Sequence, residues 1–556
     1  MSYLHKHGRT RVPQSVPIPG AGQVENSAGG YAWALDDWAR LRRFLVLGSE
    51  GGTYYASERT LTRENAQVIE RCLREDGPRT VAEILAISVE GRAPKNDPAL
   101  FALAMAAGTT DVETRRAALG ALARVARTGT HLFAFASFVE GFRGWGRSLR
   151  RAVGGWYAEQ PLEALGYQAV KYRQREGMTH RDLLRLAHPG RRVSAGNPTH
   201  EVSDEHRDLF EWIVRGGDAP AAPRVVEGFV RAQAAGTAGE TATLVGEYRL
   251  PREALRPEHM TAPAVWDALL ADMPMTALIR NLATMTRVGV LEPGSAGTLR
   301  VVAQLGDVQR LRRARVHPIA LLAALRTYQS GHGARGHHSW SPVREIVDAL
   351  NAAFYTAFAN VEPAGQRMLL ALDVSASMMS GSVAGVPGLP PRDASAALAL
   401  VTAATEPRYE MVGFFAGPGG LATTRGRRGW PGHSNGLTPL ALSPRQRLDD
   451  VIKTVSGLPF GGTDCSLPMR YAQEREREID TFVIYTDSET WAGEIHPAQA
   501  LSEYRRRSGI SARLVVVGMT SNEFSIADPT DPGMLDVVGF DTATPQLISD
   551  FARGAL

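Results

Sequence analysis

Residues 368–377 read Met-Leu-Leu-Ala-Leu-Asp-Val-Ser-Ala-Ser, an apolar run that ends in one carboxylate and two hydroxyls. An unbroken apolar run of this length is typical of a strand that is buried on both faces of a parallel sheet. Further short β-branched runs follow, with helix-like segments between them. This alternation predicts a doubly wound, Rossmann-like α/β domain over residues 361–556. The expected strands are 368–373, 409–415, 481–486 and 513–517, and the expected helices are 393–405, 444–456 and 496–508.

The sequence before this domain, from Trp33 to Asn360, is helical in pattern almost throughout. Apolar residues recur at helical spacing, and Gly, Pro, Asp or Ser separates one expected helix from the next. Many short helices over residues 31–360 predict stacked helix pairs of the HEAT kind, although no sharp repeat motif is present. The expected helices include 36–47, 62–75, 99–107, 111–127, 132–143, 205–215, 275–287 and 318–328.

Two segments are expected to lack regular structure. Residues 1–30 are rich in Gly, Pro, Ser and basic residues, and we expect them to form a flexible N-terminal arm. The Gly- and Arg-rich segment Gly417–Asn435 is expected to be a loop inside the α/β domain.

The composition of the 556 residues is that of a folded protein, with 44% hydrophobic and 22% charged residues. Lys and Arg outnumber Asp and Glu by 62 to 58, so a nucleic-acid site would require basic residues clustered on one face. The two cysteines exclude a disulfide framework and favour a reducing compartment. Because no secretory signal and no apolar run of about 20 residues is present, we expect a cytoplasmic protein.

Oxygen-bearing side chains follow two of the expected strands and also occur in a loop between them. In an open α/β sheet, ligands bind beyond the carboxyl ends of the strands, so these segments are expected to converge there. Two carboxylates and three hydroxyls suit a hard divalent cation, most simply Mg²⁺, and do not suit zinc or copper. The alternative is that the serines cap a helix and the first aspartate closes a turn. The candidate metal ligands are Asp373, Ser375, Ser377, Thr463 and Asp487.

The same residues do not form a recognisable catalytic set. A phosphoaspartate phosphatase needs Asp-x-Asp at the first strand end, and Ser375 stands where its acid/base group would be. The sequence contains no P-loop, no Gly-x-Ser-x-Gly elbow and no His-Glu-x-x-His motif. A metal-dependent hydrolase would lack a nucleophile or base at a suitable spacing. We therefore predict that the protein is not an enzyme.

The densest basic segment of the helical half runs from Leu165 to Pro189. Lys171 and Arg175 are four residues apart, so a helix through both would present them on one face, with Gly177 at its end. This layout favours contact with phosphates, and the neighbouring Tyr172 and His188 could stack or form hydrogen bonds. The alternative is an ordinary solvated helix surface.

A second short helix is expected directly after the first. Thr179 and Asp182 predict a capping box at its start, and Arg181 and Arg185 share one of its faces. Basic residues next to aromatic residues elsewhere favour unpaired RNA, because bases stack while phosphates need neutralising. Those clusters are Arg143, Arg147, Arg150 and Arg151 near Trp145 and Trp156, and Arg310, Arg312, Arg313 and Arg315 before His317.

Several long stretches resemble the Ro autoantigen family. They are Lys171–His188 (KYRQREGMTHRDLLRLAH), Arg43–Tyr55, Met273–Arg287 and Arg315–Gly333. The family joins a TROVE module, a ring of HEAT-like repeats, to a von Willebrand factor A domain, and the resemblance covers nearly the whole chain. It implies that the candidate ligands form a metal-ion-dependent adhesion site, in which the serines and the threonine contact the metal and the aspartates act directly or through water.

The resemblance also implies an RNA-binding function. Ro proteins bind Y RNA on the outer surface of the ring. They pass the single-stranded 3′ ends of misfolded or immature noncoding RNAs, including rRNA precursors, through the central hole. Bacterial relatives use a Y RNA to tether polynucleotide phosphorylase, an exoribonuclease, for RNA quality control and maturation. The main alternative is a protein-adhesion scaffold that grips an acidic partner through the metal without RNA, and the basic clusters argue against it.

Residue by residue, the resemblance assigns Lys171, Arg175 and His188 to Y RNA and places Arg280, Asn281 and Arg287 at the hole. Animal relatives carry tryptophan where this chain has Met178, so a contact made by the tryptophan ring in those relatives is not expected in this chain. The full set of candidate RNA-binding residues is Lys171, Tyr172, Arg175, Arg181, Arg185, His188, Arg280, Asn281, Arg287, Arg315 and His317. For a lone histidine such as His317, the alternative is a packed or helix-capping residue, which is the more common role.

Overall fold

The computed structural model describes two compact units, one of Met1–Val68, Arg92–Pro94 and Phe358–Leu556 and the other of Ile69–Gly91 and Lys95–Ala357. The described residues are 10–48, 58–175, 177–189, 192–193, 200–218, 220, 223–333, 338–358, 361–383, 389–416, 436–458 and 461–556. The segment Gly417–Asn435, expected to be a loop, lies outside them. Within those ranges, no helix is long and apolar enough to span a membrane.

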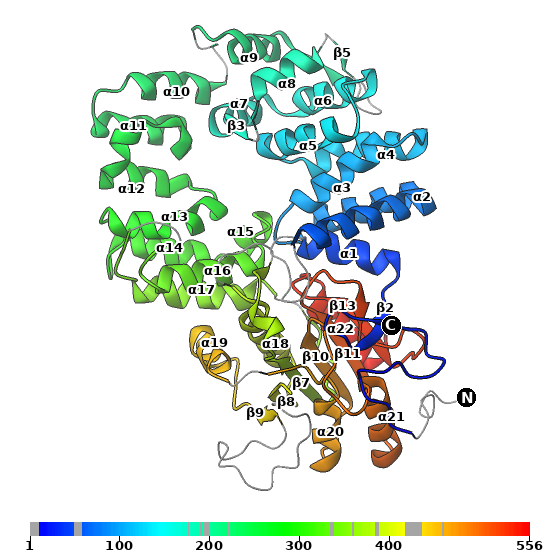
Figure 1. Ribbon diagram of the computed structural model, residues 1–556. Coiled ribbons are helices and arrows are strands. Elements are labelled where there is room, and N and C mark those ends of the chain that lie inside the picture. The colour runs from blue at the N-terminus through cyan, green and yellow to red at the C-terminus, as the bar shows by residue number, and fades with distance from the viewer. Residues whose placement is uncertain are drawn as a thin grey trace. The chain divides into compact units, whose positions relative to one another are not determined.

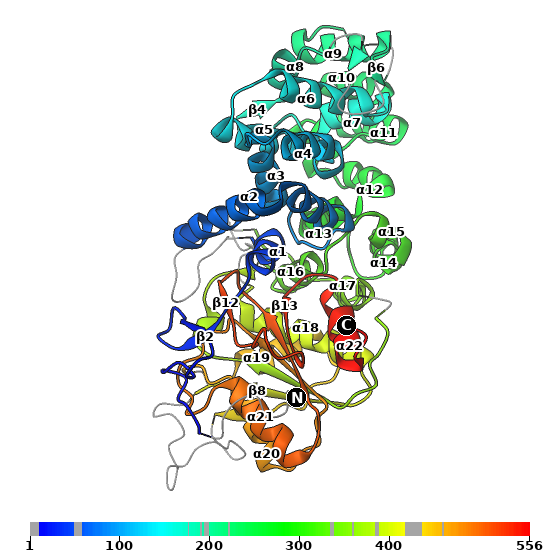
Figure 2. The same cartoon turned by 90° about the vertical axis from the view of Figure 1, so that its right-hand side faces the viewer.

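The second unit is built of stacked helices, as expected from the sequence (Figure 1). Helices close in sequence pack on one another, and α3 to α9 follow as successive layers (Figure 2). The helices are α2 (Glu58–Glu90), whose part up to Val68 belongs to the first unit, α3 (Asp97–Gly108), α4 (Val112–Val125), α5 (Gly129–Phe142), α6 (Arg147–Glu159), α7 (Leu162–Lys171), α8 (His180–Ala187), α9 (Asp204–Arg215), α10 (Arg224–Ala234), α11 (Ala238–Tyr248), α12 (Pro263–Asp272), α13 (Met275–Arg287), α14 (Ala296–Gly306), α15 (Val308–Arg313), α16 (Pro318–Gln329) and α17 (Arg344–Thr356).

Short elements connect these helices. Two two-residue hairpins occur, and two 3₁₀ turns lead from α11 to α12. The hairpins are β3 (Gln174–Arg175) with β4 (Met178–Thr179) and β5 (Arg192–Val193) with β6 (His200–Glu201), and the turns are η2 (Arg252–Ala254) and η3 (Pro257–Thr261).

The first and last parts of the helical unit meet. Gly91, just after α2, has φ +69°, and a Cβ on it would lie 3.4 Å from the Cβ of Arg315, which follows α15. Repulsion from Arg315 adds to burial in lowering the pKa of Arg127, which follows α4. Arg127 in turn donates hydrogen bonds of 2.9 Å to the carbonyl and hydroxyl oxygens of Ser88 in α2. The segment after α15 therefore lies next to the segments that follow α2 and α4.

The first unit contains a six-stranded sheet in the order β13-β11-β10-β7-β8-β9, parallel except for β9. The strands are β7 (Met368–Asp373), β8 (Tyr409–Phe414), β9 (Leu437–Pro439), β10 (Thr481–Thr486), β11 (Arg513–Gly518) and β13 (Met534–Val538). The predicted bounds of β7 and β10 are confirmed, because buried apolar runs at the centre of a parallel sheet give the clearest strand signal. The strands β9 and β13 were not expected from the sequence.

Helices cover both faces of the sheet, which confirms the doubly wound fold. Leu369 and Ala371 face a core shared with α20 and α21, whereas the hydroxyls of Tyr485 in β10 and Thr402 in α18 lie 3.1 Å apart on the opposite face. Figure 1 shows these helices around the strands. The remaining elements of this unit are α1 (Asp37–Leu47), η4 (Ser377–Met379), α18 (Pro391–Thr405), α19 (Leu448–Ser456), α20 (Leu467–Glu474), α21 (Pro497–Ser508) and α22 (Thr544–Arg553).

The expectation of a flexible N-terminal arm is wrong for the described residues from Thr10 onward. The strand β2 (Tyr31–Ala34) pairs with β1 (Gln23–Glu25) on one side and with β12 (Phe524–Ser525) on the other. The Gln14 side chain is fully buried, and its Nε2 donates to Asp464 Oδ1 at 2.7 Å. The segment is extended and is held by hydrogen bonds, and a few apolar side chains such as Ile18 also pack into the hydrophobic core of the unit. The α/β unit therefore begins with this segment, not at residue 361.

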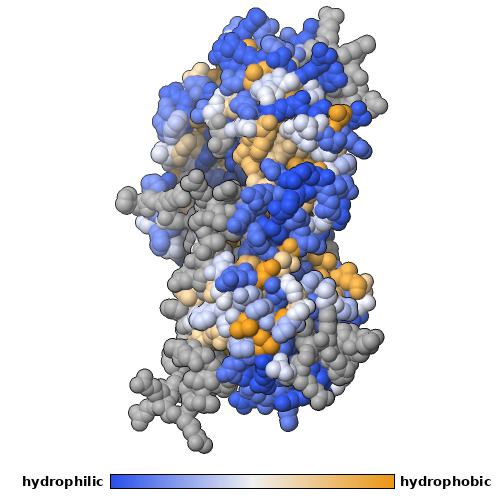
Figure 3. Space-filling model, turned by 45° about the vertical axis from the view of Figure 1, so that its right-hand side comes forward, coloured by the Kyte–Doolittle hydropathy of each residue, from blue (hydrophilic) through white to orange (hydrophobic). Residues whose placement is uncertain are grey.

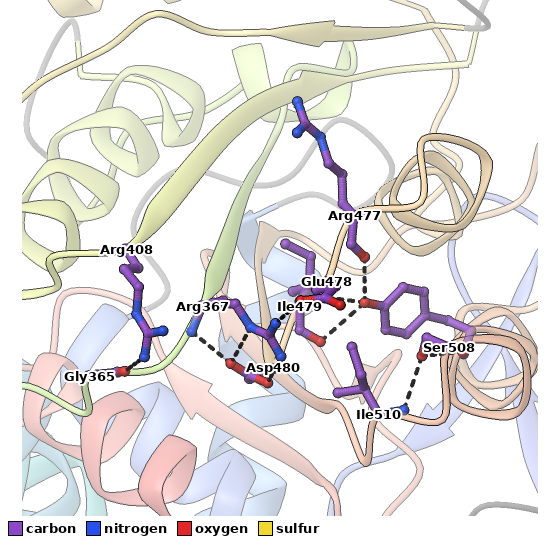
Figure 4. Close-up of polar contacts among 10 residues, drawn as sticks. Gly365, Arg367, Arg408, Arg477, Glu478, Ile479, Asp480, Ser508 and Ile510 are labelled. Carbon is purple, nitrogen blue, oxygen red and sulfur yellow. Dashed lines mark hydrogen bonds and ion pairs between the residues drawn. The ribbon is translucent and has the colours of Figure 1, made fainter.

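A polar network joins the amino-terminal ends of the central strands (Figure 4). The backbone N–H and Nε of Arg367 both donate to Asp480 Oδ2 at 2.9 Å, and Nη2 donates to Oδ1 at 2.7 Å. These hydrogen bonds from Arg367 lower the pKa of Asp480. Beside them, the N–H of Ile479 donates to the Tyr504 hydroxyl at 2.6 Å, which ties α21 to the start of β10. This network is at the end of the sheet opposite to the candidate metal ligands.

The face drawn in Figure 3 is mainly hydrophilic, and its hydrophobic residues lie in separate small groups. Large hydrophobic side chains that are exposed, such as Val112 at 55% and Leu299 at 61%, lie on different helices. Scattered exposed residues of this kind are normal on protein surfaces.

Candidate metal centre and nucleic-acid interface

The carboxyl ends of β7 and β10 bring the predicted metal ligands together. Asp373 ends β7, and its Oδ1 accepts the N–H of Ser375 at 2.9 Å. The hydroxyl oxygens of Ser375 and Ser377 lie 3.0 Å apart, and Ser377 also forms a side-chain hydrogen bond with Asp487, directly after β10. Convergence at these strand ends was predicted from the sequence, and the structure confirms it for these four residues. Thr463, in the loop before α20, is fully buried.

The site is buried and has unmatched oxygen atoms. The hydroxyl of Thr463 and Oδ2 of Asp487 are buried without a hydrogen-bond partner among the described residues. Burial and the Asp487 carboxylate raise the pKa of Asp373 to about 7, and burial also raises the pKa of Asp487. Two carboxylates withdrawn from water beside a hydroxyl without a hydrogen-bond partner are the arrangement that a divalent cation neutralises. The residues therefore fit a hard cation.

A third carboxylate, Glu489, was not predicted as part of this site. Its Oε2 accepts the N–H of Ala28 at 3.1 Å, whereas Oε1 is buried with no hydrogen-bond partner in the described structure. Burial and the Asp487 charge raise the pKa of Glu489 to about 8. The sequence signal was its place two residues after Asp487 in the same loop.

The N-terminal segment holds the loop that carries Glu489. The Asn26 side chain donates to the Thr490 carbonyl at 2.8 Å, and the Gln14 side chain donates to the Ile495 carbonyl at the same distance. A Cβ on Gly30 would lie 1.9 Å from the Thr490 carbonyl oxygen, so only glycine permits this close approach. Residues remote in sequence thus fix the backbone of a loop at the candidate metal site.

In the helical unit, Lys171 lies among aromatic and basic side chains. It is the last residue of α7, and its Nζ donates to the Tyr167 hydroxyl at 3.2 Å. The same Nζ lies 5.1 Å from the centre of the Tyr167 ring and 5.3 Å from that of Tyr172, within range of a cation–π interaction. Burial, Arg280 and Arg252 lower the pKa of Lys171, and Glu253 opposes them. We name Lys171, Tyr167, Tyr172, Arg252 and Arg280 the Lys171 cluster.

The expectation that Lys171 and Arg175 share a helix face is wrong. The helix α7 ends at Lys171, and Arg175 lies in the hairpin of β3 and β4, whose turn contains Gly177 at φ +74°. The Arg175 guanidinium forms an ion pair of 2.8 Å with Asp97 at the start of α3. Gly177 serves a hairpin turn rather than a helix C-terminus, a difference that local spacing alone does not show.

The second helix of the segment is confirmed as α8. Thr179 caps it, and the reciprocal hydrogen bonds between Thr179 and Asp182 form the predicted capping box. Arg181 and Arg185 are exposed on α8, and exposed His188 ends it in a left-handed conformation with φ 45°. These three side chains remain accessible for the predicted contacts.

The residues predicted on α13 differ in exposure. Arg280 and Arg287 are exposed, whereas Asn281 is 8% exposed and holds the helix to η2 by accepting a hydrogen bond of 3.1 Å from Arg252. Because Arg280 interacts electrostatically with Lys171, the structure brings together two residues that the resemblance assigns to different RNA sites.

Two predicted aromatic or histidine contacts have a structural role instead. His317 is buried, and its Nδ1 accepts the N–H of Ile319 at 3.1 Å as the N-cap of α16. Trp156 is fully buried and donates to the Ala126 carbonyl, so it cannot stack on RNA. Arg315 is exposed at φ 48°.

Comparisons with known proteins agree with this architecture. The TROVE domain family matches residues 24–215 and 251–366, and the Ro60 vWA domain family matches residues 367–552. "RNA-binding protein RO60" of Deinococcus radiodurans is 42% identical over 534 residues, covering 96% of each chain. The protein of the same name from Caenorhabditis elegans is 35% identical over 617 residues, covering 98% of this chain and 92% of its own. The crystal structure of the Deinococcus radiodurans RO (RSR) protein matches with a TM-score of 0.68 and 40% identity, over 94% of this chain and 100% of that chain.

Proposed function

The chain belongs to the Ro60 family, and from this membership we propose that it is a noncoding-RNA-binding protein whose RNA surface is on the helical unit. The observation that carries the proposal is the Lys171 cluster, in which a half-buried ammonium and two arginines, offset in part by the Glu253 carboxylate, are combined with two tyrosine rings. Cations neutralise phosphates, and aromatic rings stack on unpaired bases.

In this proposal a structured RNA of the Y class contacts Lys171, Arg175 and His188. The single-stranded 3′ end of a misfolded or immature noncoding RNA contacts the α13 residues Arg280 and Arg287. Support comes from the exposure of His188, Arg280 and Arg287. The protein would act in the cytoplasm with an exoribonuclease such as polynucleotide phosphorylase, in RNA quality control and maturation.

The competing proposal is a metal-dependent adhesion scaffold that binds no RNA. Purification without nuclease separates the two, because an RNA-binding protein retains nucleic acid and absorbs more strongly at 260 nm than at 280 nm. RNase treatment should abolish the excess absorbance. A preparation that is free of RNA at low salt and does not bind added RNA would favour the scaffold. Crosslinking in cells followed by sequencing would then identify the bound RNAs.

We further propose that Asp373, Ser375, Ser377, Thr463 and Asp487 hold a divalent cation, most simply Mg²⁺. A cation there would supply positive charge, and an open coordination position could attract an acidic group of a partner. The buried carboxylate pair and the unpartnered Thr463 hydroxyl support this.

Replacing either carboxylate should weaken Mg²⁺ binding by at least about tenfold, because carboxylate charge provides most of the affinity of such sites. The variants are Asp373→Ala and Asp487→Ala, and calorimetric titration of the full chain with Mg²⁺ measures the loss. Replacing Asp449, an acidic residue on α19 outside the site, by Ala is the control. RNA affinity of these variants should stay within about twofold of wild type. A folded variant that loses RNA binding would contradict the proposal that the helical unit binds RNA and the α/β unit binds the cation.

We also propose that the protein has no catalytic activity of its own on RNA. Incubation with labelled RNA, with and without Mg²⁺, should give no cleavage, ligation or phosphorylation on gels. Turnover that persists through further purification and disappears in the Asp373→Ala variant would contradict this.

A further inference from the structure

Glu489 is a fully buried carboxylate beside the proposed cation site. It follows the candidate ligand Asp487 by two residues, and its backbone N–H donates to Asp487 Oδ1 at 3.1 Å. The side chains of the two residues also interact electrostatically. A negative charge on Glu489 therefore acts on any cation that Asp487 binds.

The two oxygen atoms of the Glu489 side chain have different surroundings. Oε2 accepts the N–H of Ala28 at 3.1 Å, and Ser27 also donates to this carboxylate. The turn that carries these donors is closed by Asn26, whose Oδ1 accepts the N–H of Gly30 at 2.8 Å. Several donors around one carboxylate favour its charged form. The N-terminal segment thus holds one oxygen of a buried negative charge.

The other oxygen of Glu489 belongs to a group of unsatisfied atoms. Among the described residues, Oε1 of Glu489, Oδ2 of Asp487 and the hydroxyl of Thr463 are buried oxygen atoms without a hydrogen-bond partner. The N–H of Trp491 donates to the Thr463 carbonyl at 3.1 Å, so the loops that carry these atoms lie side by side. Because buried polar atoms nearly always have a partner, such atoms on adjoining loops indicate a common ligand.

The position of Glu489 does not suit a direct metal ligand. In the part of the chain that the structure describes, no three acidic, histidine or cysteine side chains are arranged to bind one metal ion together. Mg²⁺ usually keeps several of its water molecules when it binds a protein, and such water molecules need acceptors. Groups outside the ligand set that orient ligands or accept such hydrogen bonds commonly determine the affinity of a metal site.

We propose that Glu489 strengthens cation binding from outside the ligand set, through its negative charge and through a water that the cation retains at Oε1. Its hydrogen bonds with Ser27 and Ala28 link the cation to the N-terminal segment. Because such a linkage is reciprocal, a bound cation also stabilises the attachment of this segment. The inference rests on the proposed cation site and adds to it a third acidic residue and a coupled segment.

The first test measures Mg²⁺ affinity by calorimetric titration of the full chain. In Glu489→Gln an amide keeps the shape and one acceptor oxygen but removes the charge, and we expect about tenfold weaker binding. Glu489→Asp keeps the charge and should recover most of the affinity. The matched control is Glu494→Gln, which changes an exposed glutamate of the same loop and should stay within about twofold of wild type.

A trivalent cation separates the charge of Glu489 from its shape. Coulomb energy is proportional to the cation charge, so a tenfold loss for Mg²⁺ corresponds to about thirtyfold for Tb³⁺. The luminescence of Tb³⁺ reports its binding, because a nearby indole sensitises it. Trp491 supplies the indole, since a Cβ on Gly462, next to Thr463, would lie 2.8 Å from its ring. Equal losses for both cations in Glu489→Gln would show a displaced loop rather than a lost charge, and the charge role would be wrong.

The link to the N-terminal segment has a separate measurement. In hydrogen–deuterium exchange of the full chain, saturating Mg²⁺ should raise the protection of backbone amides in residues 23–34 of wild type and of Glu494→Gln. The rise should be absent in Glu489→Gln, also at saturating Mg²⁺, because the cation no longer acts on the acceptor of the Ala28 N–H. A rise of the same size in Glu489→Gln would refute the link.

The outcomes separate this inference from the proposed cation site. If wild type binds neither Mg²⁺ nor Tb³⁺, the proposed site itself is wrong. If wild type binds Mg²⁺ and Glu489→Gln binds it within about twofold as tightly, the site stands and the role of Glu489 is overturned. Thermal unfolding followed by circular dichroism shows whether each variant is folded. If Glu489→Gln does not fold, Glu489→Ala takes its place, since it puts no amide in the interior, and the same losses are expected.

Discussion

Replacing Arg505 by alanine should destabilise the α/β unit by about 3–5 kcal/mol, the cost of leaving a buried charge without its partner. Arg505 of α21 and Asp531, in the connection from β12 to β13, have fully buried side chains and form an ion pair of 2.7 Å. The Arg505 Nε also donates to the Ala512 carbonyl at 2.7 Å. Without the guanidinium, the Asp531 carboxylate would remain in the interior with only backbone donors.

Hydrogen–deuterium exchange of the full chain measures the loss of stability in the α/β unit. Amide protection in β11 and β13 should fall by about 100-fold or more, because about 1.4 kcal/mol corresponds to a factor of ten. Arg507→Ala is the control, since Arg507 is exposed on the same helix and should change the stability by less than about 0.5 kcal/mol. Equal protection in wild type and Arg505→Ala would show that the pair does not stabilise the unit.

Replacing Lys171 and Arg175 together by alanine should weaken the binding of a Y-like stem RNA and reduce its salt dependence. Each phosphate contact contributes roughly 0.7–0.9 to the slope of log affinity against log salt, so the slope should become shallower by about 1–2. A single-stranded 3′ tail should lose less, because Arg280, Arg287 and base stacking remain. Fluorescence anisotropy across a salt series measures both RNAs, and the control is Arg116→Ala with Arg124→Ala, two exposed arginines on α4.

The proximity of Lys171 and Arg280 adds a second arm to this experiment. If the stem and the tail have separate sites, Lys171→Ala should weaken the binding of the stem RNA more, and Arg280→Ala should weaken the binding of the 3′ tail more. Equal losses for both RNAs in both variants would show one shared site across the Lys171 cluster. An unchanged salt slope for the stem RNA in the Lys171 and Arg175 double variant would mean that these side chains do not touch its backbone.

The parts that the sequence predicted correctly depend on signals that are local and strong. The apolar runs of β7 and β10 specify buried strands, and the position of polar residues at strand ends brings Asp373 and Asp487 together. The Thr179 capping box was also predictable, since it requires only residues three apart in the chain.

The parts that were wrong depend on contacts with distant segments. Arg175 has helical spacing from Lys171, but the chain turns into a hairpin and Arg175 pairs with Asp97, 78 residues earlier. The N-terminal segment has the composition of an unstructured arm, yet Gln14 is buried through bonds to residues more than 400 positions away. His317 was included among the RNA contacts, but the capping alternative is the one the structure shows, because its ring nitrogen caps α16. These contacts join residues that are distant in the sequence, so no local sequence pattern could predict them.

The central claim is that RNA binds the helical unit at the segment of α7, β3, β4 and α8. Photocrosslinking of a stem RNA containing 4-thiouridine, followed by mass spectrometry of the crosslinked peptides, tests it most directly. The account predicts crosslinks in peptides that contain Tyr172 and His188, and their loss in the Lys171 and Arg175 double variant at matched RNA concentration. Crosslinks confined to the α/β unit, with none in residues 162–189, would contradict it.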